Sequence, residues 1–95
     1  MDEEYDVSVL NSLNISDNLI DIRDKYEYML GHIDKAINIP MNYLYMNPEN
    51  YLNKEKKYYL YCDYGTKSRK LSSFLNDLGY KTISLIGGYE KYIEK

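Results

Sequence analysis

The chain has 95 residues, of which 44% are hydrophobic and 28% are charged, a composition typical of a globular protein and not of a disordered tail. It carries 12 basic and 15 acidic residues, a formal net charge of −3, without a long block of either sign. This balance argues against nucleic-acid binding, and the acidic N-terminus without a long apolar run argues against a secretory signal or a membrane span. We therefore expect a single domain over residues 1–95 that is cytoplasmic and has no nucleic-acid or membrane partner.

The first third of the chain is predicted to contain two short strands and one helical turn. Tyr5-Asp6-Val7 is predicted to form a strand, and Ser8 is predicted to cap a helical turn that runs through Leu13. The apolar run Leu19-Ile20-Asp21-Ile22 is bounded by Asn18 and by charged residues, which predicts a strand carried in a buried sheet.

A helix is predicted directly after that strand. Asp24 and Glu27 have the spacing of a capping box, and Gly31 is a typical helix end. Three residues predict an apolar helix face: Tyr26, Met29 and Leu30. The run Ala36-Ile37-Asn38-Ile39 predicts a further strand, which ends at Pro40.

The middle of the chain is less regular. A short helix is predicted over 43–46, and Pro48 is predicted to start a second turn. The charged stretch 54–57 is interpreted as a solvated loop ahead of the next strand. Residues 58–61 are apolar without alternation, as expected for a strand that is covered on both faces.

The clearest helix follows that strand. Its apolar residues have the i, i+3, i+4, i+7 spacing of a helix face: Leu71, Phe74, Leu75 and Leu78. Gly79 is predicted to cap this helix, residues 82–86 to form a strand, Gly87-Gly88 a tight turn and residues 89–95 a terminal helix. Because strands and helices alternate with short connections, the sequence predicts an α/β fold with a mainly parallel sheet.

Cys62 is the only cysteine, which excludes an intrachain disulfide, a Cys-x-x-Cys redox pair and a cysteine-rich zinc site. A lone cysteine is most often an inert buried residue. Cys62, however, lies between the end of strand 58–61 and the start of the next helix, where ligands bind to parallel sheets. The unpaired N–H groups and the dipole of a helix N-terminus stabilise a thiolate there, so we interpret Cys62 as a candidate nucleophile.

The residues after Cys62 fit this interpretation. Gly65 permits the backbone to curl so that successive N–H groups point at the sulfur, and Ser68 can donate to a thiolate or cap the helix. Lys67 is expected to lean over the loop, whereas Arg69 is expected to point to solvent. A carboxylate aimed at the sulfur would disfavour the thiolate, so we expect Asp63 to point to solvent.

The whole loop resembles the Cys-x-x-Gly-x-Arg-Ser loop of the rhodanese-like sulfurtransferase family, and the resemblance covers about Leu19 to Tyr92. The candidate loop residues are Cys62, Asp63, Tyr64, Gly65, Thr66, Lys67 and Ser68. Further stretches resemble family motifs in the same order: Asp21-Ile22-Arg23, Gly31-His32-Ile33, Ala36-Ile37-Asn38-Ile39-Pro40 and Gly87-Gly88-Tyr89. The resemblance implies a rhodanese-like α/β fold with a mainly parallel five-stranded sheet and helices on both faces.

The resemblance also implies an activity. The Cys62 thiolate would attack the outer sulfur of a donor such as thiosulfate or a persulfide, and the resulting persulfide would pass its sulfur to a thiol or another nucleophile. A small-molecule donor and a thiol acceptor are thus the expected partners, with a partner protein as an option and with no cofactor or metal. His32 is expected to be structural. Four residues are expected to support the loop: Asp21, Arg23, Gly87 and Gly88.

Two departures from the family pattern matter. Lys67 replaces the usual Arg, which keeps the charge but loses the bidentate fork that suits an oxyanion. Lys35 replaces a usual Gly, which suggests a different turn. A Cys-dependent phosphatase or arsenate reductase would need a longer Cys-x5-Arg loop, and Ser68 occupies that Arg position. A persulfide carrier, a redox sensor and a protein-interaction module remain alternatives.

Overall fold

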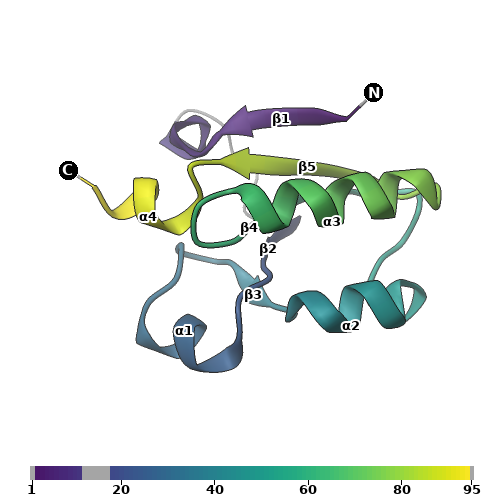
Figure 1. Ribbon diagram of the computed structural model, residues 1–95, viewed down its shortest axis with the longest axis horizontal. Coiled ribbons are helices and arrows are strands. Elements are labelled where there is room, and N and C mark those ends of the chain that lie inside the picture. Colours follow the sequence, from purple (N-terminus) through teal and green to yellow (C-terminus); the bar gives the residue numbers. More distant parts are fainter. Residues whose placement is uncertain (1, 12–17, 95) are drawn as a thin grey trace.

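The computed structural model describes residues 2–11 and 18–94, which form a parallel sheet with helices on both faces (Figure 1). The strands are β1 (Glu3–Asp6), β2 (Leu19–Asp21), β3 (Ile37–Asn38), β4 (Lys57–Tyr61) and β5 (Lys81–Ile86). They lie in the order β1-β5-β4-β2-β3, and all four pairings are parallel. The expected α/β fold with a five-stranded sheet is therefore confirmed.

The helical segments cover the two faces of this sheet. They are the 3-10 helices η1 (Val7–Asn11) and η3 (Pro48–Asn50) and the α-helices α1 (Lys25–Leu30), α2 (Met41–Met46), α3 (Thr66–Asp77) and α4 (Gly88–Ile93). Predicted and observed elements differ mostly by one or two residues at their ends, and the last predicted residue, Lys95, lies outside the described residues. Within the described ranges no helix is long and apolar enough to span a membrane.

Side chains along β4 point alternately into two apolar cores, as the pleat of a strand requires. Leu60 belongs to a core that contains Leu71 of α3, and this core lies on the face covered by α2 and α3. Tyr61 belongs to a second core that contains Val7 of η1 and Leu85 of β5, with Tyr89 of α4 packed against it. The central strand is thus covered on both faces, and its lack of polar alternation follows from this.

The N-terminal elements begin earlier than the sequence predicts. β1 spans Glu3–Asp6, because these residues pair in register with Ile83 to Ile86 of β5, and Val7 is already buried in η1. The prediction that Ser8 caps the following turn is wrong: the Asp6 carboxylate accepts the N–H of Ser8 at 2.9 Å. The predicted end of that turn, Leu13, lies outside the described residues.

The apolar face predicted for α1 does not contact the core. Tyr26, Met29 and Leu30 are 80%, 68% and 91% exposed. The helix start is as predicted, since the Asp24 carboxylate accepts the N–H of Glu27 at 2.9 Å. The side chain that faces the protein is instead Tyr28, whose hydroxyl donates to the carbonyl oxygen of Ala36 at 2.6 Å. A polar anchor, and not apolar packing, therefore sets the rotation of this helix.

Helix α3 is also rotated relative to the predicted face. Phe74 and Leu78 are partly exposed, although both were expected to be buried. The buried residues of the helix are Ser68, Leu71, Ser72 and Leu75. The Ser72 hydroxyl is 2.6 Å from the Thr82 hydroxyl of β5, so a hydrogen bond between buried hydroxyls takes the place of part of the apolar contact.

Tyr61 connects the end of β4 to two other segments. Its hydroxyl donates to the Asp21 carboxylate at 2.7 Å and accepts the N–H of Ile33 at 3.0 Å, and the side chain is fully buried. Burial raises the pKa of Tyr61 above its ordinary value of 10.0, and the neighbouring Asp21 raises it further, while the Ile33 N–H acts in the opposite direction.

We expect Tyr61→Phe to lower the free energy of unfolding by about 1–3 kcal/mol, because Asp21 and the Ile33 N–H each lose a partner. The unfolded chain releases the Tyr61 proton near pH 10.0, whereas the folded chain retains it. The stabilisation is therefore complete below that pH and declines as the pH rises through it. Urea unfolding at neutral pH and above pH 10.0 should show a gap between wild type and variant that narrows in alkali. The exposed Tyr64→Phe is the matched control, and a gap independent of pH would contradict the account.

Candidate active site

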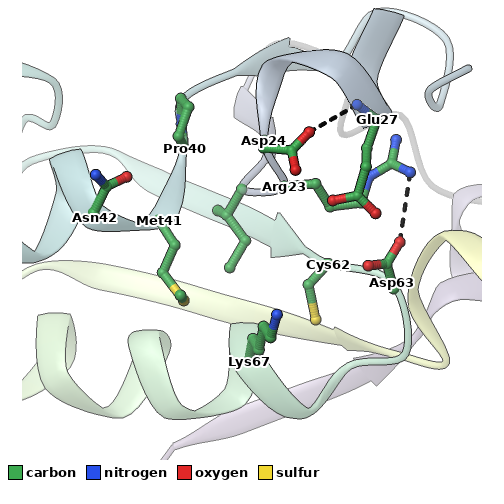
Figure 2. A pocket seen from close by; sticks show the side chains of 10 residues that line it. Arg23, Asp24, Glu27, Pro40, Met41, Asn42, Cys62, Asp63 and Lys67 are labelled. Carbon is green, nitrogen blue, oxygen red and sulfur yellow. Dashed lines mark hydrogen bonds and ion pairs between the residues drawn. The ribbon is translucent and has the colours of Figure 1, made fainter. Parts of the chain in front are cut away.

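Cys62 follows β4 directly, and its side chain lies in the loop that leads to α3 (Figure 2). The residue is 3% exposed. Its Sγ accepts the N–H of Gly65 at 3.2 Å and the N–H of Ser68 at 3.3 Å. Gly65 has a φ of 104°, in the left-handed region that glycine favours, and this curl turns its N–H toward the sulfur. The predicted cradle of N–H groups around the sulfur is thus present.

Ser68 is held in position by a second hydroxyl that sequence reasoning missed. Its Oγ lies 3.6 Å from the Sγ of Cys62, donates to the carbonyl oxygen of Gly65 at 3.1 Å, and is 2.7 Å from the hydroxyl of Ser84. Ser68 and Ser84 are both fully buried. The sequence did contain a signal for this contact: Ser84 is a small hydroxyl residue in the middle of the buried apolar strand β5.

The turn between β5 and α4 packs directly against the loop. The carbonyl oxygens of Cys62 and Asp63 accept the N–H groups of Tyr89 and Glu90, each at 2.9 Å. A Cβ at Gly88 would overlap these same two carbonyl oxygens, so the close approach requires glycine. Gly87, with a φ of 90°, reverses the chain just before α4, and its N–H lies against Gly65. Both glycines therefore contact the loop, where the sequence expected them to act.

A buried ion pair braces the loop from the neighbouring strand. The guanidinium of Arg23 lies 2.7 Å from the Asp21 carboxylate, and both side chains are almost inaccessible. Arg23 also donates to the carbonyl oxygen of Gly31 at 2.6 Å and stacks over the ring of Tyr89 at 4.2 Å. Burial by itself lowers the pKa of Arg23, but the contacts with Asp21 more than offset this and raise it above the ordinary value.

Asp63 does not point to solvent, contrary to the prediction from the sequence. Its carboxylate lies 3.6 Å from the Arg23 guanidinium, on the side of the loop away from the sulfur (Figure 2). Glu27 of α1 contacts Asp63. Partial burial raises the pKa of Glu27, as do its contact with Asp63 and the charge of Asp24, whereas the charge of Arg23 lowers it. Three carboxylates thus gather on one side of the site.

The sulfur lies between two surface pockets. One, of about 220 Å³, has an apolar wall that includes Ile22 and Met41 and a polar wall that includes the three carboxylates (Figure 2). The other, of about 260 Å³, is lined by the exposed residues Tyr64 and Thr66. Lys67 lines both pockets, as does Cys62, so the expectation that Lys67 leans over the loop is confirmed. Arg69 is exposed, as predicted.

His32 and Lys35 lie outside both pockets. The His32 ring stacks on Tyr28 at 3.8 Å, and its Nδ1 is 2.8 Å from the Tyr28 carbonyl oxygen, which agrees with the expected structural role. Lys35 has a φ of 72°. Lys35 therefore has the left-handed conformation that glycine favours, which costs about 1–2 kcal/mol for a residue that carries a Cβ.

The chain belongs to the rhodanese-like domain family, whose model matches residues 6–95. It is 35% identical over 75 residues to the thiosulfate sulfurtransferase GlpE of Coxiella burnetii. This match covers 78% of this chain and 69% of GlpE. It is 33% identical over 81 residues to a tRNA uridine(34) hydroxylase of Buchnera aphidicola. That match covers 79% of this chain but 26% of the longer protein, so this chain corresponds to about a quarter of it.

Solved structures have the same fold. SSP1007 of Staphylococcus saprophyticus superimposes with a TM-score of 0.82 at 28% identity, over 95% of this chain and 92% of that one. The human single-domain sulfurtransferase TSTD1 gives a TM-score of 0.81 over 100% of this chain and 98% of that one. The latter is 24% identical and therefore supports the fold alone.

The contact between Gly88 and the loop generates a stability prediction. Gly88→Ala and Gly79→Ala both place a Cβ on a left-handed residue, which costs about 1–2 kcal/mol. Only Gly88→Ala also overlaps backbone oxygens of the loop, so we expect it to lose about 1–3 kcal/mol more in urea unfolding. It should also change the rate at which iodoacetamide alkylates Cys62, the only thiol. Equal losses for the two variants would show that the contact does not position the loop.

Proposed function

We propose that this protein is a sulfurtransferase that moves a sulfane sulfur from a donor such as thiosulfate or a persulfide to a thiol or another nucleophilic acceptor. Cys62 is the nucleophile. The observation that carries the proposal is the pair of N–H groups, from Gly65 and Ser68, at 3.2 and 3.3 Å from the sulfur of the only cysteine. N–H groups aimed at the sulfur favour the thiolate, which is the reactive form. Membership of the rhodanese-like family supports the same reaction.

In the first half-reaction, the Cys62 thiolate attacks the outer sulfur of the donor. A bond forms between the two sulfur atoms, the sulfur–sulfur bond of the donor breaks, and sulfite leaves when the donor is thiosulfate. In the second half-reaction, an acceptor thiolate attacks the terminal sulfur, becomes a persulfide and releases the Cys62 thiolate. The sulfur moves without net loss of electrons from the protein, so neither step needs a second cysteine.

The surrounding residues have supporting roles in this proposal. The loop N–H groups stabilise the negative charge of the sulfur, and the Ser84 hydroxyl orients the side chain of Ser68. Asp21 and Arg23 position the loop through Asp63, and the start of α4 positions it through its N–H groups. None of these supporting groups needs to exchange a proton with the substrate.

Intact-mass measurement tests the proposal. After incubation with thiosulfate or with cysteine persulfide and removal of the donor, the wild-type protein should gain one sulfur atom, and Cys62→Ser should gain none. The wild type should also form thiocyanate from thiosulfate and cyanide, whereas Cys62→Ser should fall to the background rate. An unchanged mass with both donors would exclude a persulfide-forming enzyme or carrier and leave an interaction module.

Lys67 generates a prediction about the donor. Its ammonium lines both pockets beside Cys62, so it is placed to attract an anionic donor. We expect Lys67→Ala to lower kcat/KM for thiosulfate by about tenfold, mainly through KM, and Lys67→Arg to retain the activity because its fork suits an oxyanion. Arg69→Ala removes an exposed cation from the same helix and is the matched control. Equal losses of kcat/KM in Lys67→Ala and Arg69→Ala would show that only the net charge of the protein matters and not the position of Lys67.

A further inference from the structure

The exposed apolar face of α1 is an unusual surface for so short a helix. Tyr26, Met29 and Leu30 are all largely exposed, and none of the residues of α1 is buried. Contiguous exposed apolar side chains in a globular protein mark a binding surface more often than isolated ones do. Tyrosine and methionine are also enriched where proteins contact other proteins. We call these three residues the α1 apolar face.

This face is fixed in place and is not a product of a loosely attached helix. The Asp24 carboxylate caps the first turn, and the Tyr28 hydroxyl holds the helix to the carbonyl oxygen of Ala36. Beyond the last turn, the carbonyl oxygen of Gly31 accepts a hydrogen bond from Arg23. Polar contacts thus hold the helix while its apolar side chains remain in solvent. The surface is preorganised for a partner, which lowers the entropic cost of binding.

Helix α1, which carries the α1 apolar face, also contributes to the pocket that contains Cys62. Glu27, on the same helix, lines that pocket and interacts with Asp63 of the loop. Asp24, the helix cap, lines it as well. The carboxylates of Asp24, Glu27 and Asp63 all line this one pocket (Figure 2). A ligand that covers the α1 apolar face and reaches Cys62 therefore crosses an acidic edge.

The charges along this route indicate the chemistry of the ligand. Arg23 is bound to the Asp21 carboxylate and to backbone and loop acceptors, so its charge is largely neutralised. The other cation that lines the pocket, Lys67, lies on α3 and not on α1. The whole chain has a formal net charge of −3. A basic segment would be attracted to this edge, and an RNA backbone would be repelled. A small thiol needs no apolar surface of this extent.

We propose that the α1 apolar face and the acidic edge formed by Asp24, Glu27 and Asp63 dock a polypeptide sulfur acceptor. This acceptor presents its cysteine thiol within a segment of apolar and basic residues. The inference rests on the proposed function and names the partner of the second half-reaction. The acceptor thiolate attacks the terminal sulfur of the Cys62 persulfide, the Cys62 sulfur–sulfur bond breaks, the peptide leaves as a persulfide, and Cys62 returns to the thiolate.

The test uses the full chain, loaded with one sulfur atom by cysteine persulfide and freed of donor. Three acceptors are compared by mass spectrometry: a peptide with one cysteine among leucines and lysines, the same peptide with glutamates for the lysines, and dithiothreitol. We expect transfer to the basic peptide to be faster than to the acidic one by about tenfold or more, the range of a few interface contacts. The difference should shrink at high salt.

Variants locate the docking surface. Met29→Ser combined with Leu30→Ser should slow transfer to the basic peptide by about tenfold and leave transfer to dithiothreitol unchanged. Leu78→Ser removes a partly exposed leucine at the end of α3 opposite to the Cys62 loop, and it should have no effect on either acceptor. Circular dichroism and thermal unfolding verify that the variants remain folded.

The outcomes separate the two proposals. If Cys62 takes up no sulfur, the proposed function fails and docking is irrelevant to it. If Cys62 loads normally but both peptides react at the same rate, or if the α1 variant slows dithiothreitol as much as the basic peptide, the docking proposal is wrong and the proposed function stands.

Discussion

The buried ion pair between Asp21 and Arg23 is the contact on which the arrangement around Cys62 depends. It joins the end of β2 to the active-site loop through Asp63 and to the end of α1 through Gly31. The Tyr61 hydroxyl donates to the same Asp21 carboxylate. A buried pair of this kind adds little net stability, but removal of one partner leaves a charge without compensation. Its effect is therefore to impose one geometry on three segments that are distant in sequence.

The sulfur site within this frame is made largely of backbone. Gly65 and Ser68 provide the N–H groups at the sulfur, and the carbonyl oxygens of the loop are occupied by the start of α4. Backbone groups held by neighbouring elements cannot reorient freely, so they are ready to stabilise charge on the sulfur before a donor arrives. Side chains around the pockets, such as Lys67 and Glu27, then determine which donors and acceptors approach.

The sequence was sufficient to predict the parts of this site that depend on local backbone geometry. The positions of Cys62 and Gly65 follow from a strand, a short loop and a helix, each of which has a local signal. Contacts between distant segments were not predictable in the same way. The Tyr28 hydroxyl sets the rotation of α1, and hydroxyls that face β5 set the rotation of α3. The helix faces were predicted from the spacing of apolar residues alone, which takes no account of such hydroxyl contacts. Asp63 was misplaced because its partner, Arg23, lies on another strand end.

A crystal structure of the protein after incubation with a sulfur donor tests the central claim most directly. The account predicts one additional sulfur atom bonded to Cys62 and directed into the curl of the loop, within hydrogen-bond distance of backbone N–H groups between Asp63 and Ser68. An unmodified Cys62, or an added sulfur atom that points away from these N–H groups, would contradict the claim that the loop is a persulfide cradle.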